Sequence, residues 1–400
     1  MRLSLLFLAL ALACSGGDDD TAVVTDTAVP ADTDTASDTD TDADSDTDTD
    51  SDTDTEPPPP PTWWELSDPC SGHIPYALSF ENPLSGLVGC GSGRGLWSTS
   101  DAGDTFTYAF PDTNEGSFYV NQIVRDGDDT LVCGHDYAQD PGVFLYRYRA
   151  GEWSTLLSYG SNEADPSWAQ LANCGAVASD GEGHMIVASD TSGDIIMSED
   201  GGENWGPQLR YWEDDNLDDG GYSYYYMLNL VAVEGYGFAG AGSRIVEPPV
   251  FYGPSGHEGA AWFSFDAVQI ADLQGEVWAL ATPDQGVTWF AGGRDQAASS
   301  VASGFLYRSS DGGQSWEDVS LGGTVDIMHD IVFDEDGLHG VAVGHRYPPG
   351  SLGGFVALTY DGGDSWILRE QDVPPLYTAA ISGGTYWVAG EGYLARGIFK

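Results

Sequence analysis

Beyond residue 61 the chain alternates short apolar runs with turns rich in glycine and aspartate, and this pattern repeats along the sequence. Each unit contains an apolar run, a turn and a second run of small apolar residues, such as Gly340–Gly344 or Trp289–Gly293. A loop and a polar turn that ends in an aromatic residue complete the unit. Short apolar runs bounded by such turns predict β-strands, so we expect an all-β domain.

The polar turn carries a motif that recurs four times in the form Ser/Thr-x-Asp-x-Gly-x-Ser/Thr/Asn-Trp/Phe. The copies span Thr99–Phe106, Ser198–Trp205, Ser309–Trp316 and Thr359–Trp366. The aspartate can accept hydrogen bonds from backbone N–H groups that a tight turn leaves unpaired, and the glycine supplies a positive φ. The aromatic ring can pack between neighbouring sheets. We therefore expect a structural role for Asp101, Gly103, Asp200, Gly202, Trp205, Asp311, Gly313, Trp316, Asp361, Gly363 and Trp366.

Two degenerate copies, Tyr148–Trp153 and Gly256–Trp262, fill the long gaps, so that the closing aromatic residue recurs about every 50 residues. A single unit of this kind cannot bury its apolar face alone, and such repeats predict sheets stacked around a common axis.

The two ends of the repeat region predict how the ring closes. Three more strands follow the last motif, at Tyr377–Ser382, Thr385–Gly390 and Gly397–Lys400, and Thr62–Leu66 can supply a fourth. We expect a single β-propeller of four-stranded blades over residues 62–400, with seven blades and with strands from both chain ends in one blade. Six or eight blades are the alternatives.

One further segment, Thr282–Trp289, fits the motif but occupies a different place in the period. It falls where other units have the turn between their first and second strands, as at Asp334–Gly337. We therefore interpret it as a chance match that precedes a second strand.

The motif resembles the Asp-box repeat, also called the BNR repeat, of the sialidase-like β-propellers. Over residues 62–400 the units are similar to those of the photosystem II assembly-factor propellers and their bacterial relatives. In such families the motif lies between the third and fourth strands, on the face away from the ligand. The resemblance implies a non-catalytic propeller that binds a protein or glycan partner.

The first 61 residues predict export and a tether. Residues 1–13 are apolar after Arg2 and look like a lipoprotein signal peptide, in which Cys14 becomes the lipidated residue. Ala11–Ala13 also suits cleavage without lipid, so a secreted or periplasmic protein is the alternative. Residues 15–61 are rich in Asp, Thr and Pro, with no basic residue, and we expect a disordered linker at the outer membrane or cell surface.

The charge excludes some partners. The chain carries 64 acidic and 13 basic residues, which gives a formal net charge of −51. Such a surface opposes nucleic acid and anionic lipid, so we expect membrane contact only through the lipid anchor. We expect a monomer that needs no cofactor.

The cysteines predict disulfides. Cys70, Cys90, Cys133 and Cys174 make an even number in an oxidising compartment, with three possible pairings. We favour Cys70–Cys90 and Cys133–Cys174, because each pair would tie the approach to a first strand to a neighbouring second strand.

Basic residues recur where the second strand of a unit ends. They are Arg94, His135, Arg244, Arg294, His345 and Arg346. Arginines that converge on a channel mouth would bind a carboxylate or sulfate, because guanidinium holds such groups through two hydrogen bonds. The alternative is that each arginine pairs with a local acid, for example Asp295 or Glu247.

An acidic segment offers a second candidate site. It contains Glu213, Asp214, Asp215, Asp218 and Asp219. Clustered carboxylates suit Ca²⁺, and the alternative is a solvated acidic loop.

The alternative function is a secreted glycoside hydrolase of the sialidase or xyloglucanase type. Sialidases carry an Arg-Ile-Pro before the first Asp box, whereas this chain has His73-Ile74-Pro75. A neutral histidine lacks the fork of donors that grips a sugar carboxylate. Xyloglucanases join two such propellers, whereas this chain has one. We therefore favour a surface-displayed binding module for a protein or glycan.

Overall fold

The structure is a computed structural model of the 400-residue chain. It describes residues 63–400 apart from 111–116, 139–141, 159–170, 172, 190–193, 207–208, 211–225, 234–236, 244–248, 253–265, 270–274, 296–302, 320, 322–326, 347–352 and 371–372. The predicted signal peptide, Cys14 and the tether lie outside the described residues.

The described residues form 28 strands and no helix, so no helix in this part of the chain could span a membrane. Unit 1 contains β2 (Pro75–Phe80), β3 (Gly86–Cys90), β4 (Gly95–Thr99) and β5 (Thr107–Tyr108). Unit 2 contains β6 (Phe118–Asp126), β7 (Asp129–Asp136), β8 (Val143–Arg149) and β9 (Glu152–Ser158). Unit 3 contains β10 (Ala176–Ser179), β11 (Met185–Ala188), β12 (Asp194–Ser198) and β13 (Leu209–Arg210).

The remaining strands follow the same plan. Unit 4 contains β14 (Tyr226–Val233), β15 (Gly237–Ser243), β16 (Pro249–Tyr252) and β17 (Asp266–Gln269). Unit 5 contains β18 (Gly275–Ala281), β19 (Trp289–Asp295), β20 (Ser303–Ser309) and β21 (Glu317–Asp318). Unit 6 contains β22 (Ile327–Phe333), β23 (Gly340–Arg346), β24 (Gly353–Thr359) and β25 (Ile367–Glu370). The closing sheet contains β26 (Leu376–Ser382), β27 (Thr385–Gly390), β28 (Tyr393–Ile398) and β1 (Trp63–Glu65).

These strands form six hydrogen-bonded sheets, so the structure shows six blades and not the seven predicted. Five sheets have four strands, and the sixth has eight, because units 4 and 5 are joined. A single residue pair, Ser243 in β15 with Glu276 in β18, makes the connection. The sequence period does not reveal this pairing, since it links two strands that belong to different repeats.

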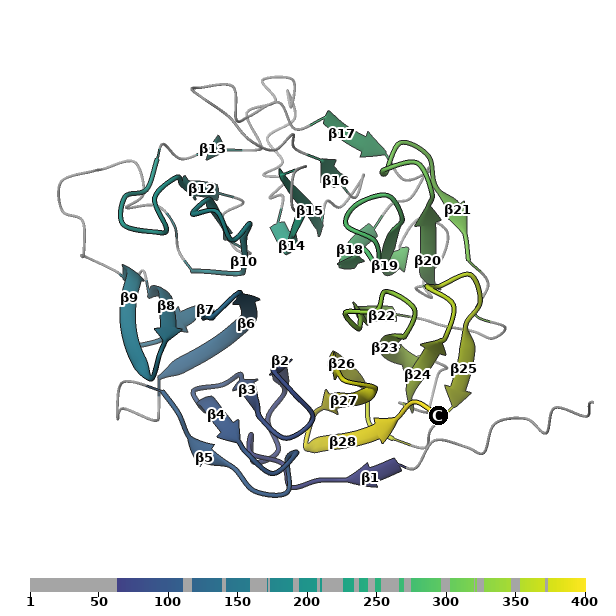
Figure 1. The fold of residues 1–400 in the computed structure, drawn as a ribbon, viewed down its shortest axis with the longest axis horizontal. Coiled ribbons are helices and arrows are strands. Elements are labelled where there is room, and N and C mark those ends of the chain that lie inside the picture. The colour runs from purple at the N-terminus through teal and green to yellow at the C-terminus, as the bar shows by residue number, and fades with distance from the viewer. Residues whose placement is uncertain are drawn as a thin grey trace, which may run out of the picture. The chain divides into compact units, whose positions relative to one another are not determined.

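The sheets are arranged around a central axis, as Figure 1 shows. The innermost strands lie side by side in the order β2, β6, β10, β14, β18, β22 and β26, and β26 lies beside β2. The all-β propeller architecture predicted from the repeats is therefore confirmed.

The closing sheet joins the two ends of the described chain. β1 pairs with β28, so the strand near residue 62 completes this sheet as the sequence predicted. Trp63 also donates a hydrogen bond from Nε1 to the Tyr393 hydroxyl, at 2.9 Å. The third strand of this sheet is Tyr393–Ile398 and not Gly397–Lys400, because β28 begins directly after the short turn that follows β27. Closure in this way leaves no sheet edge open at the junction.

The core lies between neighbouring sheets, which explains why most inner strands are apolar on both faces. Leu131 and Leu145 of unit 2 pack with Val187 and Ile196 of unit 3, and all four are fully buried. Small residues allow the sheets to approach each other. A Cβ on Gly89 of β3, for example, would lie 2.4 Å from Cγ1 of Val120 in β6.

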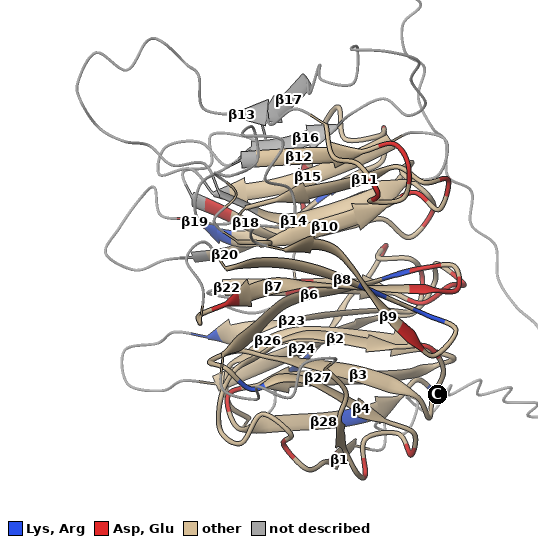
Figure 2. Cartoon of the chain, turned by 90° about the vertical axis from the view of Figure 1, so that its left-hand side faces the viewer, with Lys and Arg blue, Asp and Glu red and all other residues tan. Residues whose placement is uncertain are grey.

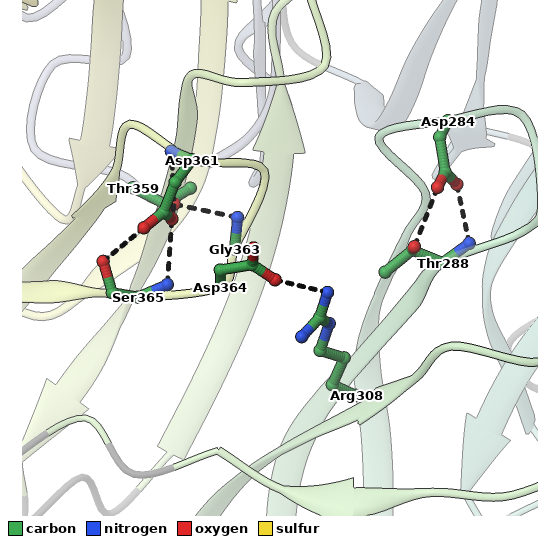
Figure 3. Close-up of polar contacts among 8 residues, drawn as sticks. All are labelled: Asp284, Thr288, Arg308, Thr359, Asp361, Gly363, Asp364 and Ser365. Carbon is green, nitrogen blue, oxygen red and sulfur yellow. Dashed lines mark hydrogen bonds and ion pairs between the residues drawn. The ribbon is translucent and has the colours of Figure 1, made fainter.

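The four copies of the motif form the same turn, which we call the Asp turn, between the third and fourth strands of their units. In Thr359–Trp366, Asp361 Oδ1 accepts a hydrogen bond from the Ser365 N–H at 2.8 Å and Oδ2 accepts one from the Ser365 hydroxyl at 2.5 Å (Figure 3). The Thr359 hydroxyl oxygen accepts the Gly363 N–H at 2.8 Å. Gly363 has φ +86° and faces the Phe290 ring, so a side chain there would be strained and obstructed.

The segment Thr282–Trp289 lies between β18 and β19, in the position predicted from the period. Its interpretation as a chance match is nevertheless wrong at the level of local structure. Asp284 accepts hydrogen bonds from the Thr288 N–H at 2.6 Å and the Thr288 hydroxyl at 2.7 Å (Figure 3). The Gly286 N–H donates to the Thr282 hydroxyl at 2.7 Å. The residues of the motif therefore close the same turn wherever they occur.

Two disulfides join Cys70 to Cys90 and Cys133 to Cys174. They are the two pairs favoured from the sequence. All four cysteines are fully buried. Each bond fixes the segment before an innermost strand to a second strand: Cys70 precedes β2 and bonds to Cys90 at the end of β3, and Cys174 precedes β10 and bonds to Cys133 within β7.

The Asp turns predict a loss of stability in acid. Hydrogen bonds from the Ser315 hydroxyl and N–H lower the pKa of Asp311 to about 2 from its ordinary 3.8. The folded pKa is below the unfolded one, so this carboxylate stabilises the fold above about pH 4, and its contribution is lost as the pH falls towards 2. We expect Asp311→Asn to make the urea midpoint less dependent on pH in this window. An unchanged dependence would contradict the assignment.

Candidate ligand-binding site at the channel mouth

Six of the innermost strands share one irregularity, a shift of register near their first residues. Such a β-bulge adds an unpaired residue and redirects its side chain. The residues at the shifts are Tyr76, Asn121, Leu228, Trp278, His329 and Tyr377. The bulges therefore place one side chain from each of these six strands at the same end of the ring.

All six bulge residues line a cavity of about 390 Å³ in the central channel. The cavity is walled by the innermost strands from every part of the ring. These strands begin at this end and run towards the opposite face, where the β2–β3 turn contacts the first Asp turn through Ala102 N–H and Leu84 O, at 2.8 Å. We call the end with the bulges the channel mouth.

Aromatic rings dominate the channel mouth. Trp278 stacks on His329 with ring centroids 4.6 Å apart and planes inclined by 16°. Tyr377 lies 4.7 Å from His329 and 6.4 Å from Tyr76. Tyr76 continues the series to Tyr119, at 5.0 Å. Because these side chains come from different units, the ring of sheets assembles a surface that no single repeat contains.

Two histidines meet at this surface. His329 Nε2 lies 3.1 Å from His345 Nδ1, so one ring nitrogen donates and the other accepts. Burial, together with the neighbouring His345, lowers the pKa of His329 to about 3. At neutral pH His329 is therefore uncharged, and the pair offers ring nitrogens within an aromatic wall.

Asp330 is the single carboxylate among the described residues that line the channel. Burial raises its pKa to about 6, although hydrogen bonds from the Ala379 N–H at 2.9 Å and the Thr378 hydroxyl at 3.2 Å favour the charged form. These contacts join β22 to β26. Asp330 therefore holds two innermost strands together.

Other polar side chains make the same connection between innermost strands. Asn121 Nδ2 donates to the Cys174 carbonyl at 2.8 Å, and Gln122 Oε1 accepts the Val177 N–H at 2.6 Å. Asn229 Nδ2 donates to the Trp278 carbonyl at 3.3 Å. Such bonds satisfy polar groups and fix the spacing of the strands that present the aromatic residues.

The basic residues predicted for this face do not form one cluster. None of the described arginines Arg94, Arg294 and Arg346 lines the channel cavity, and Arg244 lies outside the described residues. Arg94 is exposed in the β3–β4 turn. Arg294 pairs across the ladder with Glu276, and its charge partly offsets the burial that raises the pKa of Glu276. The described arginines are thus distributed over several units.

The two predicted histidines do take part in the channel mouth. His345 contacts His329, and His135 lies 4.6 Å from Tyr137, which in turn lies 5.9 Å from Tyr119. The aromatic bulge residues were not found from the sequence. They share a position one to three residues after the first residue of their strands, which can be recognised only when the strand starts are known.

The acidic segment proposed for Ca²⁺, from Glu213 to Asp219, lies outside the described residues. Among the described residues, Asp180, Glu182 and His184 bring three possible ligand atoms together in the β10–β11 turn. Asp180 Oδ1 accepts the N–H groups of Glu182 at 2.9 Å and His184 at 3.1 Å. The contacts of Asp180 therefore close this turn.

Neither a protein-family model nor a curated protein sequence matches the chain. Several solved structures are similar to it. YCF48 from Cyanidioschyzon merolae is 17% identical, with a TM-score of 0.56, over 84% of this chain and 98% of that one. YCF48 bound to D1 peptide is 16% identical, with a TM-score of 0.53, over 84% of this chain and 97% of that one.

A glycoside hydrolase shares the fold as well. The GH74 xyloglucanase from Xanthomonas campestris is 14% identical, with a TM-score of 0.54. The match covers 84% of this chain and 53% of the xyloglucanase, so the chain spans about half of that enzyme. At these identities the similarity concerns the β-propeller fold alone.

Proposed function

We propose that the chain is a surface-displayed, lipid-anchored binding module of the Asp-box type, which recognises a protein or glycan through its channel mouth. The observation that carries this proposal is the set of aromatic bulge residues Tyr76, Trp278 and Tyr377, together with the pair His329 and His345. Exposed or half-buried aromatic rings with a few fixed polar atoms are typical of binding sites. We further infer that the eight-stranded sheet corresponds to two blades, because β14 and β18 both belong to the inner ring.

Binding of a peptide is one supported form of this function. YCF48, a propeller of similar fold, has been solved bound to D1 peptide. An aromatic mouth suits a peptide or sugar better than a nucleic acid, since the chain has a formal net charge of −51.

The xyloglucanase similarity supports hydrolysis as the second candidate. Glycosidases of the usual kind need two carboxyl groups on opposite sides of the scissile bond. Among the described residues that line the channel, Asp330 is the sole carboxylate, and it is hydrogen-bonded to β26. This arrangement favours binding over hydrolysis.

The test presents the full chain to immobilised sialylated, sulfated and neutral glycans and to a peptide library, and it measures retention and sugar release. We expect retention without release, and we expect Trp278→Ala to weaken it by about tenfold through the loss of one stacking surface. Leu338→Ala is the control, because Leu338 is 52% exposed in the β22–β23 turn of the opposite face.

Two outcomes would contradict this proposal. Release of sugar that is lost in Asp330→Asn would favour the hydrolase. Retention that is unchanged in Trp278→Ala and Tyr377→Ala would exclude the channel mouth as the binding surface.

A further inference from the structure

At three junctions between neighbouring units, an arginine of the third strand contacts the Asp turn of the next unit. Arg308 of β20 forms an ion pair with Asp364 in the Asp turn of unit 6, with Nη2 and Oδ1 2.6 Å apart (Figure 3). Arg147 of β8 donates to the Gly201 carbonyl in the Asp turn of unit 3, at 3.3 Å. Arg396 of β28 donates to the Ala102 carbonyl in the Asp turn of unit 1, at 3.2 Å. In each case the arginine contacts the next unit's turn through a polar interaction.

The junction between units 1 and 2 lacks both parts of this contact. Ser98 takes the arginine's position in β4, since it directly precedes Thr99 as Arg308 directly precedes Ser309. In unit 2 the third and fourth strands are joined by the two residues Ala150 and Gly151, with φ +52° and +90°, in place of an Asp turn. A short side chain and a short turn therefore meet at this junction, whereas an arginine contacts an Asp turn at the three junctions described above.

A cavity of about 410 Å³ lies at this junction. We call it the unit 1–2 groove, and its lining includes Ser98, Thr99, Arg125, Thr130, Tyr148 and Trp153. It lies at the Asp-turn end of the sheets, opposite the channel mouth. In Figure 2 this end of the sheets lies on the right, where acidic residues in several turns are coloured red.

The groove contains an aromatic platform. The rings of Tyr148 and Trp153 lie 5.0 Å apart and are inclined by 47°, and Tyr148 is 37% exposed. Both residues are held by the β8–β9 ladder, in which Tyr148 and Trp153 are paired. Arg149, at the end of β8, forms a two-fold hydrogen bond with the buried Asp129, and this contact anchors the hairpin.

A fixed guanidinium faces the platform from the inner side of the groove. Arg125 Nε donates to the Ser79 hydroxyl at 3.0 Å, and Nη1 lies 3.6 Å from a carboxylate oxygen of Glu81. Burial lowers the pKa of Arg125, which nevertheless stays charged at neutral pH. Glu81 also lines the groove, so donors and acceptors lie beside the rings.

We propose that the unit 1–2 groove binds a neutral saccharide. A sugar ring has an apolar C–H face that can stack on Tyr148 and Trp153, and its edge hydroxyls can pair with Arg125 and Glu81. The pairing of opposite charges in the groove disfavours both a simple anion and a simple cation. The net charge of the chain further opposes an acidic sugar. Arg125 also lines the channel cavity, but Tyr148 and Trp153 do not, so the proposal does not rest on the function proposed for the channel mouth.

The test titrates the full chain with neutral hexasaccharides of glucose, xylose and mannose and measures dissociation constants by calorimetry. We expect at least one of these sugars to bind, and we expect Tyr148→Ala to weaken binding by about tenfold. Tyr148→Phe keeps the ring and is expected to retain affinity within about twofold.

Ser98→Arg introduces the residue that Arg308 provides at the equivalent position of unit 5 and is expected to fill the groove and abolish binding. Ser100→Arg is the matched control, because Ser100 is exposed two residues away and outside the groove lining. If Ser98→Arg fails to fold, the comparison of Tyr148→Ala with Tyr148→Phe still tests whether the groove binds the sugar. Absence of binding to every hexasaccharide at millimolar concentration would overturn the proposal. So would binding lost in Trp278→Ala but unchanged in Tyr148→Ala, or binding of peptides alone.

Discussion

Replacing Trp387 with alanine is expected to lower the free energy of unfolding by about 3–5 kcal/mol, the range for a large aromatic residue removed from a core. Trp387 lies in β27 of the closing sheet and is fully buried. Its ring stacks on Phe80 of unit 1, with centroids 3.6 Å apart and planes inclined by 4°. Its Nε1 donates to the Ala102 carbonyl, at 3.2 Å.

The effect should be large because of where this tryptophan lies. It belongs to the last sheet and contacts the first unit, so its contacts close the ring. Arg396 shares the Ala102 carbonyl as an acceptor, and the two residues together connect β27 and β28 to the first Asp turn. Loss of the ring leaves a cavity at the one junction that the chain does not cross in sequence order.

Equilibrium unfolding in guanidinium, followed by far-ultraviolet circular dichroism, measures this change. Ile367→Ala is the control, since Ile367 is 41% exposed in β25, and its expected effect is within about 0.5 kcal/mol. An effect of Trp387→Ala no larger than that of the control would show that the closing junction does not limit stability.

The fold was predictable from the sequence because its turns are locally determined. Asp311 and Ser315 are four residues apart and are hydrogen-bonded to each other in the turn, so a short sequence motif specifies the geometry of the turn. Repetition of that motif then implies repeated sheets. Asp284 shows the limit of this inference, since the same letters form the same turn between β18 and β19. The motif identifies a turn, and the period identifies which turn it is.

The channel mouth was less predictable because it is built across units. Trp278 and His329 are in contact only because β18 and β22 lie side by side, and each ring is directed inward by a β-bulge. A β-bulge cannot be recognised from the alternation of apolar and polar residues along a strand. The sequence analysis named His345, which contacts His329 at the channel mouth, together with arginines that lie at separate strand ends.

The arginines illustrate why residue type alone does not reveal a role. Arg147, Arg308 and Arg396 occur in the third strands and stabilise the junctions between units through Asp turns. At the junction of units 1 and 2, the position of Arg308 is taken by Ser98 and the Asp turn is replaced by a two-residue turn, and a groove lies there. Comparison of equivalent positions between units therefore draws attention to a groove that inspection of any one unit does not reveal.

Removal of the Cys133–Cys174 disulfide is the second change for which we expect a large effect. The two cysteines are 41 residues apart in sequence, and the chain-entropy relation for a loop of that length gives about 4 kcal/mol of stability. The bond also fixes Cys174, whose carbonyl accepts the Asn121 hydrogen bond at the channel mouth. We therefore expect the double variant Cys133→Ala and Cys174→Ala to lose both stability and binding at the mouth.

The Cys70–Cys90 disulfide provides the matched comparison. Its cysteines are 20 residues apart, so the same relation gives a smaller contribution of about 3 kcal/mol. Guanidinium unfolding of both double-alanine variants, with and without reductant, separates the loss of the bond from the change in side-chain packing. Addition of reductant should destabilise the parent and leave each variant sensitive only to loss of its remaining bond. If the two variants lost equal stability, the length of the closed loop would not govern the effect, and the packing of the buried cysteines would have to account for it.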